Sequence, residues 1–314
     1  MGPPAGSQVL ALRSYSDMDF EEIKIENYPQ HAQAVTPIQI VTLCRPGRQN
    51  AFTERMTDEL EHAFQILDVD ERVKCVVVTG HGKMFCAGAD LDTMFRKTEE
   101  KVNEHRDSGG RAALAIHRCR KPVIGALNGA AVGIGITLTL PMAIRLAPHD
   151  AKIGFVFARR GLIMEAASSF FLPRLIGMSK AMHLITTGTT YPASHPLLSD
   201  LFSETLPNAS DVLPRALSIA QDIVENCSNV SWLLNRELMW RNPGTAEGTH
   251  LLDSRIIYEL FGAADNIEGI KSFLEKRKAI FKGRVDHDIP QTYPWWQPVH
   301  LAKPRKGEVA GAKL

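Results

Sequence analysis

Short apolar runs alternate with helical segments through the first two thirds of the chain, and this alternation constrains the fold most strongly. The stretches "IQIVTL" (38–43) and "VKCVVVTG" (73–80) are rich in β-branched residues and bounded by turn residues, which predicts buried strands. Between them, residues 53–70 repeat apolar side chains near helical spacing, with Thr53 and Thr57 as candidate caps. Strands joined through helices by short links predict an α/β fold with mainly parallel strand pairing.

The whole chain divides by its pattern into three parts. Further strands are predicted within 121–129 and 144–155, with a helix of small residues between them, so a core spans about 20–210. Residues 211–284 contain helical stretches with no strand among them, and we expect them to form a module that packs against neighbouring subunits. The last part, 285–314, is rich in proline and aperiodic, which is typical of an extended arm or disorder.

The composition is that of a globular protein and excludes several classes of partner. The chain has 314 residues, of which 44% are hydrophobic and 23% charged, with a formal net charge of +1. This balance gives no electrostatic reason to expect nucleic acid or an anionic membrane as the main partner. No 18-residue apolar span or signal peptide is evident, so we expect no membrane span. Five scattered cysteines without CxxC spacing predict reduced thiols and no metal site.

The C-terminal tail carries two signals. Its adjacent tryptophans, Trp295 and Trp296, are expected to pack on the rest of the protein, because large aromatic side chains seldom stay fully hydrated. The chain finishes on Ala312, Lys313 and Leu314, one conservative step from the Ser-Lys-Leu peroxisomal address. Such a match can also arise by chance. At this position it predicts a peroxisomal import receptor as partner and the peroxisome as location.

Two glycine-containing turns follow predicted strands and are candidate ligand sites. They are "GKMFCAGADLDTM" (82–94) and "NGAAVGIGITL" (128–138). Backbone N–H groups exposed in two converging turns can form an oxyanion hole for a developing enolate. The dinucleotide-binding pattern is incomplete, because a third glycine and the following acidic residue are missing, and no phosphate-loop motif is present. The structural alternative is that small residues allow a helix to approach a strand closely.

Four blocks of sequence together resemble the enoyl-CoA hydratase/isomerase (crotonase) superfamily. In chain order they are "RPGRQNAFTERMTDEL", "MFCAGADLDTM", "KPVIGALNGAAVGIGITL" and "DNIEGIKSFLEKRKAIF", and the resemblance runs from about residue 25 to 284. It implies a crotonase-like spiral of ββα units with a C-terminal helical trimerisation region, assembled as a homotrimer or hexamer. It also implies an acyl-CoA thioester as substrate, with coenzyme A as part of the substrate and no separate cofactor.

The resemblance also assigns site residues. The oxyanion donors would be the backbone N–H groups of Ala89 and Ile134, in the first and second glycine turn. Further residues would contact the substrate. Those along the adenine and pantetheine path of coenzyme A are Arg48, Ala51, Ala87, Asp90 and Leu91, and those near the acyl group are Gly133, Phe157 and Met164.

The carboxylates decide which reaction the resemblance favours. Family hydratases use two glutamates, and their positions are occupied here by Thr137 and Phe157. Between residues 108 and 199 the acidic residues are Asp150 and Glu165. Glu165 follows "GLI" at the position of the single glutamate in Δ3,Δ2-enoyl-CoA isomerases of the peroxisomal type. The closest resemblance is therefore to these isomerases.

One carboxylate suffices for a 1,3-proton shift. Glu165 would remove a C2 proton from a 3-enoyl-CoA and return it at C4, giving the trans-2-enoyl-CoA. We expect an apolar pocket to raise the pKa of Glu165, with Phe157, Ile163, Met164 and Phe170 as its walls.

Three alternatives stand beside the isomerase. Glu165 could be a solvated residue at a helix start, stabilised by the helix dipole. The chain could be a hydratase or dehydratase of a specialised acyl-CoA, with Glu165 acting alone. It could also be a member that binds acyl-CoA without turnover.

Overall fold

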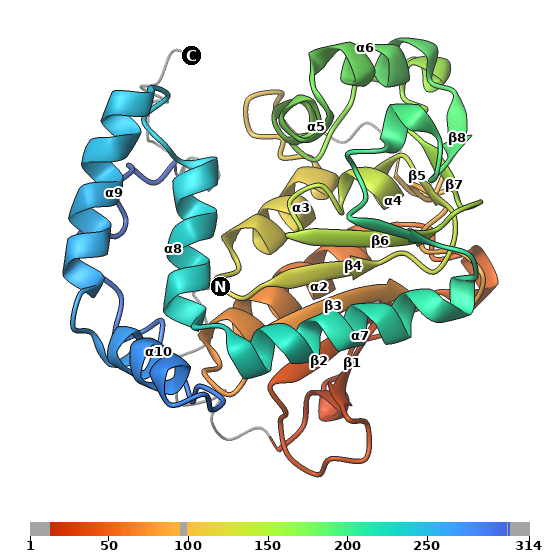
Figure 1. Cartoon of the computed structure of the whole chain (residues 1–314). Helices are drawn as coiled ribbons and strands as arrows, with labels where there is room; N and C mark the ends of the chain where they lie inside the picture. The colour runs from red at the N-terminus through yellow and green to blue at the C-terminus, as the bar shows by residue number, and fades with distance from the viewer. Residues whose placement is uncertain (1–12, 95–98, 300, 302–314) are drawn as a thin grey trace.

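A six-stranded sheet organises the protein. The computed structural model describes residues 13–94, 99–299 and 301. The sheet has the order β1-β2-β3-β4-β6-β9; β1 pairs antiparallel with β2, and the other pairs are parallel (Figure 1). This confirms the expected α/β fold with mainly parallel pairing. The strands of this sheet are β1 (Ile23–Tyr28), β2 (Ile38–Leu43), β3 (Cys75–Gly80), β4 (Val123–Ala126), β6 (Ile144–Pro148) and β9 (Glu204–Leu206). A smaller sheet contains β5 (Ala131–Val132), β7 (Lys152–Gly154) and β8 (Thr190–Pro192).

Helices cover both faces of the large sheet. α2 (Glu54–Val69) and α3 (Ser108–Arg118) pack on one face, and α7 (Ala209–Asn226) crosses the other (Figure 1). Strand β3 contributes to both cores, because Val76 joins the core beneath α2 and α3 whereas Val77 joins the core beneath α7. Burial on both sides explains why its sequence is a continuous apolar run.

The start of α2 agrees with its predicted cap. The hydroxyl oxygen of Thr53 accepts a hydrogen bond from the N–H of Met56 at 3.1 Å. Thr57 is not a cap, because its own hydroxyl donates to the carbonyl oxygen of Thr53. The first of the two candidates therefore begins the helix.

The helix of small residues expected over 133–142 is a single turn. α4 comprises Ile134–Thr137, and turns follow it. Carbonyl groups of three of the following residues accept hydrogen bonds from the buried guanidinium of Arg145, which satisfies this backbone without a longer helix. Three helices have no counterpart in the sequence prediction: α3, α5 (Ser168–Ile176) and α6 (Met178–Thr187). Short 3₁₀ helices occur at Tyr15–Asp17, Pro46–Arg48, Ala158–Arg160 and Pro196–Leu198.

Three helices stand beside the sheet as a C-terminal lobe: α8 (Asn229–Trp240), α9 (Ala246–Leu260) and α10 (Ala264–Leu274) (Figure 1). α7 also falls within the predicted module 211–284, yet it packs against β3, β4 and β6. α10 ends at Leu274, well before the end of the predicted helical module at residue 284. Lys276 adopts φ 55°, and the N–H of Arg277 donates to the carbonyl of Ser272 at 3.0 Å, which closes the helix end.

The tryptophans of the C-terminal arm pack as expected. Trp295 lies against the apolar cluster between α8 and α9, and its indole N–H donates to the carbonyl of Arg241 at 2.8 Å. The guanidinium of Arg241 lies 4.2 Å from the ring centre of Trp296. Residues 312–314 lie outside the described residues, so peroxisomal import stays a prediction. No helix in the described part of the chain is long and apolar enough to cross a membrane.

A buried ionic network joins the C-terminal lobe to the core. Arg236 of α8 and Arg241, the residue that follows this helix, both pair with the carboxylate of Glu237. Arg236 also donates to the ring Nδ1 of His117 on α3 at 3.0 Å. Burial, aided by the charge of Arg236, lowers the pKa of His117 to about 3, so the ring is neutral and can accept. The lobe is therefore attached through polar contacts that water does not reach freely.

Glu237→Gln is expected to destabilise the protein by about 3–5 kcal/mol, because it leaves two guanidinium groups without their shared carboxylate in a buried site. Urea unfolding of the variant and of the wild type measures this difference. Glu275→Gln removes an exposed pairing with Arg277 and serves as control, with an expected change within about 0.5 kcal/mol. Equal loss in both variants would contradict the importance of the buried network.

Candidate active site

Glu165 lies at a tight turn that leads into α5. The two residues after it, Ala166 and Ala167, have φ values of 56° and 51°, a left-handed conformation that L-residues rarely adopt. The N–H of Ser168 closes the turn by donating to the carbonyl of Glu165 at 2.9 Å. Asp107, the cap of α3, accepts from the N–H of Ala166 at 3.3 Å. The backbone of Glu165 is thus fixed by contacts on both sides.

The carboxyl group of Glu165 fits against two helices. A Cβ atom at Gly109 of α3 would overlap Oε2 of Glu165 and would lie 2.7 Å from Cδ1 of Ile134. The hydroxyl of Thr137, on α4, lies 2.6 Å from Oε1. Oε2 is buried and has no hydrogen-bond partner among the residues that the structure describes. One carboxyl oxygen is therefore held, and the other is available for chemistry.

The environment of this carboxyl group favours its protonated form. Burial raises the pKa of Glu165 to about 7, the hydrogen bond from Thr137 acts in the opposite direction, and the negative charge of Asp107 adds to the rise. A group with this pKa can both take up and release a proton near neutral pH. A solvated residue at a helix start would not have this burial.

The walls of the carboxyl site differ in part from those expected. Phe157 is buried and Met164 is half-buried, and their contact with the acyl group stays a prediction. Ile163 is 86% exposed in this chain, and Phe170 packs on Phe171 and Trp240, so neither encloses the carboxyl group. The expectation that these two residues form the pocket is wrong.

The residues that surround the Glu165 carboxyl group instead are Gly109, Ile134 and Thr137. The sequence prediction did not include Gly109 or Asp107, because the apolar pattern of residues 107–118 did not predict α3. The run "DSGG" (107–110), a capping residue followed by small residues, was the available signal.

The two glycine turns lie against each other. A β-bridge joins Cys86 to Ala131 between them. Gly88 has φ +106°, and a Cβ there would lie 3.1 Å from the carbonyl oxygen of Val132. A Cβ at Gly135 would lie 2.5 Å from the carbonyl oxygen of Cys86, closer than real side chains approach. The missing side chains are what allow the turns to meet.

Both expected oxyanion donors are available in this arrangement. The N–H of Phe52 donates to the carbonyl of Gly88, and the carbonyl of Phe52 accepts from the N–H of Asp90, each at 2.8 Å. The N–H of Ala89, between Gly88 and Asp90, is not used in this pairing. Gly133, with φ 56°, donates to Gly154, and the next N–H belongs to Ile134. Neither Ala89 nor Ile134 donates its N–H to an acceptor in the described part of the chain. The side chain of Ile134 adjoins the Glu165 site, which brings one donor residue and the carboxyl group together.

The residues expected along coenzyme A form a strip at the first glycine turn. Arg48 is exposed and pairs with Asp92 at 3.1 Å, and Leu91 is 73% exposed. Asp90 differs from the others, because its carboxylate is buried and pairs with Arg45 at 3.0 Å. The hydrogen bond from Arg45 holds the pKa of Asp90 below its ordinary value. The ionised Asp90 side chain therefore stabilises the turn through its pairing with Arg45. Two alanines of the strip are half-buried, Ala51 and Ala87.

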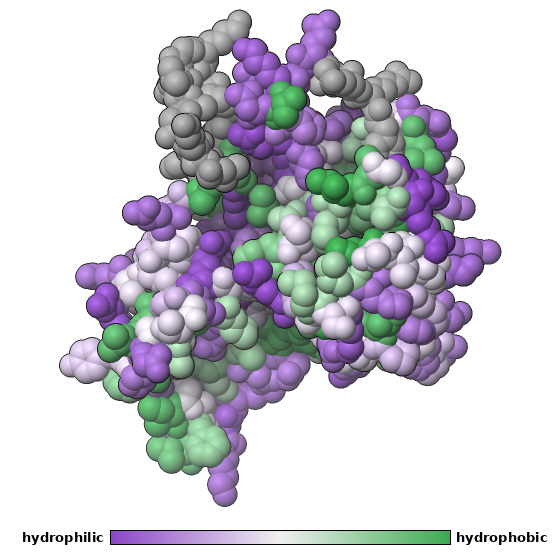
Figure 2. Space-filling model, turned by 90° about the horizontal axis from the view of Figure 1, so that it is seen from above, coloured by the Kyte–Doolittle hydropathy of each residue, from purple (hydrophilic) through white to green (hydrophobic). Residues whose placement is uncertain are grey.

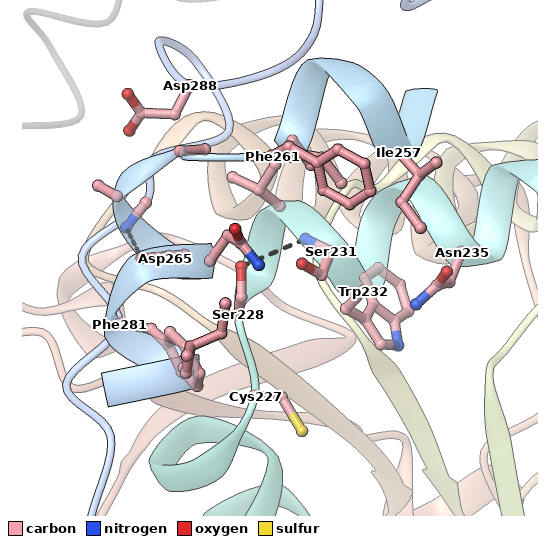
Figure 3. Close-up of a pocket in the computed structure, with 18 of the residues that line it drawn as sticks. Cys227, Ser228, Ser231, Trp232, Asn235, Ile257, Phe261, Asp265, Phe281 and Asp288 are labelled. Atoms are coloured by element: carbon pink, nitrogen blue, oxygen red, sulfur yellow. Dashed lines mark hydrogen bonds between the residues drawn. The ribbon is translucent and has the colours of Figure 1, made fainter. Parts of the chain in front are cut away.

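A separate cavity of about 960 Å³ lies in the C-terminal lobe (Figure 3). Its walls come from α8, α9, α10 and the segment after them, and they include Trp232, Phe261, Phe273 and Phe281. None of the predicted site residues lines it. The described residues contain no group of three or more side chains that could hold a metal ion.

Comparison with known proteins identifies the family in which this arrangement occurs. Residues 33–284 match the family model described as enoyl-CoA hydratase/isomerase. The chain belongs to the enoyl-CoA hydratase/isomerase family. It is similar to "Enoyl-CoA hydratase AFT3-1" of Alternaria alternata, with 50% identity over 245 residues, which is 78% of this chain and 83% of that protein. "Enoyl-CoA hydratase ACTT3" of the same organism is also 50% identical, over the same shares of the two chains.

Solved structures of enoyl-CoA hydratase/isomerase family members share the fold. The crystal structure of an enoyl-CoA hydratase from Bacillus anthracis superposes with a TM-score of 0.75 at 27% identity, covering 84% of this chain and 100% of that one. The predicted superfamily and the crotonase-like α/β fold are confirmed. The chain is accordingly an enzyme of the enoyl-CoA hydratase/isomerase family.

Gly109→Ala is expected to lower turnover of an enoyl-CoA at least about 10²-fold, because the added methyl group displaces the Glu165 carboxyl from its site. Gly47→Ala is the matched control, since a Cβ there has no atom within 4 Å, and its activity should be unchanged. Steady-state rates and thermal unfolding of both variants test this. Wild-type activity in a folded Gly109→Ala variant would contradict the placement of the carboxyl group.

Proposed function

We propose that the protein is a Δ3,Δ2-enoyl-CoA isomerase that uses Glu165 as its single acid–base group. The observation that carries this proposal is the buried carboxyl group with one free oxygen and a pKa raised to about 7. The positions of both hydratase glutamates are occupied by Thr137 and Phe157, which cannot exchange protons as carboxyl groups do. A single group that takes a proton and returns it matches a 1,3-shift.

The reaction needs three events at this site. The thioester oxygen of a 3-enoyl-CoA accepts hydrogen bonds from the N–H groups of Ala89 and Ile134, which makes the C2 proton more acidic. Oε2 of Glu165 takes that proton, and the C2–H electron pair becomes part of a dienolate. The carboxylic acid then gives the proton to C4, the double bond forms between C2 and C3, and Glu165 is again ionised.

A second candidate is a hydratase or dehydratase of a specialised acyl-CoA. The observation that favours it is the 50% identity to proteins named enoyl-CoA hydratase. In that reaction Glu165 would activate water and also supply the proton at C2. Asp107 is a second carboxylate in its surroundings, although it already caps α3 and holds the N–H of Ala166.

The isomerase proposal predicts conversion of 3-enoyl-CoA to trans-2-enoyl-CoA by the wild type and its loss in Glu165→Gln. Absorbance of the conjugated thioester measures the rate, and mass spectrometry in D₂O reports exchange with solvent. The value of kcat/KM should fall about tenfold per pH unit below about 7, since the free enzyme must hold Glu165 ionised. Asp150→Asn, which removes an exposed acid, is the control and should retain activity.

Two results would replace this proposal. A hydroxyacyl product from 2-enoyl-CoA, without isomerisation of 3-enoyl-CoA, would favour the hydratase. Binding of acyl-CoA without turnover of either substrate, unchanged in Glu165→Gln, would favour a member of the family that only binds.

We also propose that copies of the protein associate through the C-terminal lobe as a trimer or hexamer. Large apolar side chains of α9 and α10 are exposed, and hydrophobic surface is visible among polar groups on this lobe (Figure 2). These side chains are Ile257, Tyr258, Phe261, Ile267, Ile270, Phe273 and Leu274. Apolar patches of this kind mark association surfaces.

Light scattering is therefore expected to give three or six times the chain mass of 34.7 kDa. Phe273→Glu should shift the protein towards the monomer, because burying an unpaired charge in the contact is unfavourable. Met182→Glu, an equally charged change on exposed α6, should leave the mass unaltered. A monomeric wild type would contradict the assembly.

A further inference from the structure

Thr137 is the one polar side chain seen to contact the Glu165 carboxyl group in the described part of the chain, and it has a second possible partner. Its side chain is fully buried at the end of α4. The hydroxyl oxygen lies 2.6 Å from Oε1 of Glu165 and 3.3 Å from the carbonyl oxygen of Gly133. A hydroxyl group has one proton to donate, so it can serve only one of these acceptors at a time.

The protonation state of Glu165 determines which of the two acceptors receives the hydrogen bond from the Thr137 hydroxyl. An ionised carboxylate can only accept, so the Thr137 proton must point to Oε1 when Glu165 is ionised. When the carboxyl group carries a proton, the need for that donor falls, and the hydroxyl can turn to the carbonyl of Gly133. A Thr hydroxyl bonding four residues back is a common helical arrangement, so this second position is stereochemically ordinary.

The carbonyl of Gly133 belongs to the same peptide group as the N–H of Ile134. Its oxygen already accepts from the N–H groups of Ile136 and Thr137, each at 3.1 Å, so the hydroxyl adds a third hydrogen bond to this carbonyl. A hydrogen bond accepted by a peptide carbonyl polarises that peptide and strengthens its N–H as a donor. The N–H of Ile134 is one of the two donors expected to hold the thioester oxygen. Thr137 therefore lies between the acid–base group and one arm of the oxyanion hole.

We propose that Thr137 is a positioning residue that couples the proton on Glu165 to the strength of the oxyanion hole. This inference rests on the proposed function. Before proton transfer, the hydroxyl holds Oε1 and leaves Oε2 towards Gly109 and the substrate side. After Oε2 has taken the C2 proton, the hydroxyl donates to Gly133, and Ile134 binds the dienolate oxygen more strongly when its negative charge is present. Return of the proton to C4 reverses the change.

Few other ionisable groups lie around Glu165. Asp107, at the start of α3, raises the pKa of Glu165 through its charge. Cys86 interacts with Glu165, and burial raises the pKa of its thiol to about 12, so it stays neutral. α4 carries no ionisable residue. A change in the pH profile after substitution of Thr137 therefore reports on Glu165.

The test compares Thr137→Val, which removes the hydroxyl at nearly constant volume, with Thr137→Ser, which keeps it. In the valine variant we expect kcat for isomerisation to fall roughly 10- to 100-fold, the loss expected from a hydrogen bond to a charged group, with KM little changed. The midpoint of the kcat/KM pH profile should rise by roughly one unit, since a hydrogen bond to the ionised form is lost. Serine should restore both.

Thr139→Val is the matched control. Thr139 is equally buried two residues further on, but its hydroxyl donates to the carbonyl of Ile136 at 2.8 Å and does not touch Glu165. Its pH midpoint should equal that of the wild type. Thermal unfolding confirms that each variant is folded, and Thr137→Ala replaces the valine variant if the latter does not fold.

A readout that needs no turnover separates this inference from the proposed function. NMR titration of the ¹³C-labelled Glu165 carboxyl, assigned by its absence in Glu165→Gln, should show a higher midpoint in Thr137→Val than in the wild type. An unchanged midpoint and unchanged kcat would overturn the role of Thr137 even if the wild type isomerises 3-enoyl-CoA. A wild type that hydrates but does not isomerise would overturn the isomerase, whether or not the midpoint moves.

Discussion

The proposed chemistry depends on a carboxyl group that is largely removed from water without being paired with a cation. In the described part of the chain, Glu165 forms no ion pair, and the one hydrogen bond to its carboxyl group comes from a hydroxyl group. A lysine or arginine partner would keep the carboxylate ionised and lower its pKa, so it could accept a proton only weakly and would then be a strong acid. Burial with a neutral donor gives the opposite result, a group whose two protonation states are close in free energy near neutral pH.

Two distant parts of the sequence build much of this environment, and each carries a local cost in stability. The first turn of α3 contains two glycines, residues that weaken a helix, and Gly109 provides the space that the carboxyl group fills. The turn after Glu165 places Ala166 and Ala167 in the left-handed region, at about 1–2 kcal/mol for each residue. Asp107 stabilises both places, since it caps α3 and accepts from the N–H of Ala166. Strain of this kind persists where the surroundings hold it and is common at functional sites.

The sequence predicted the strands and the helix cap that depend on neighbouring residues. It did not predict contacts between residues that are far apart in the chain. Residues 38–43 form β2 as expected, and Thr53 caps α2, because periodicity and capping are properties of neighbouring residues. Glu165 was also found, as an isolated carboxylate in an apolar run. Its actual neighbours were not, because Gly109 and Asp107 reach it from a helix more than fifty residues earlier. Likewise α10 ends at Leu274 through a backbone motif at Lys276 that the apolar periodicity of the segment does not reveal.

The raised pKa of Glu165 also links the proposed reaction to the stability of the fold. Burial moves the pKa of Glu165 from its ordinary 4.5 to about 7 in the folded chain, so the folded state binds this proton more tightly than the unfolded state. The stability contributed by the bound proton is full below about pH 4.5 and is lost as the pH rises through about 7. The ionised form, which would remove a proton from substrate in the proposed reaction, is therefore the form that is less stable in the folded protein. The hydrogen bond from Thr137 opposes this loss, because it favours the ionised carboxylate. The group that limits the destabilisation is thus also the group that holds the base in place.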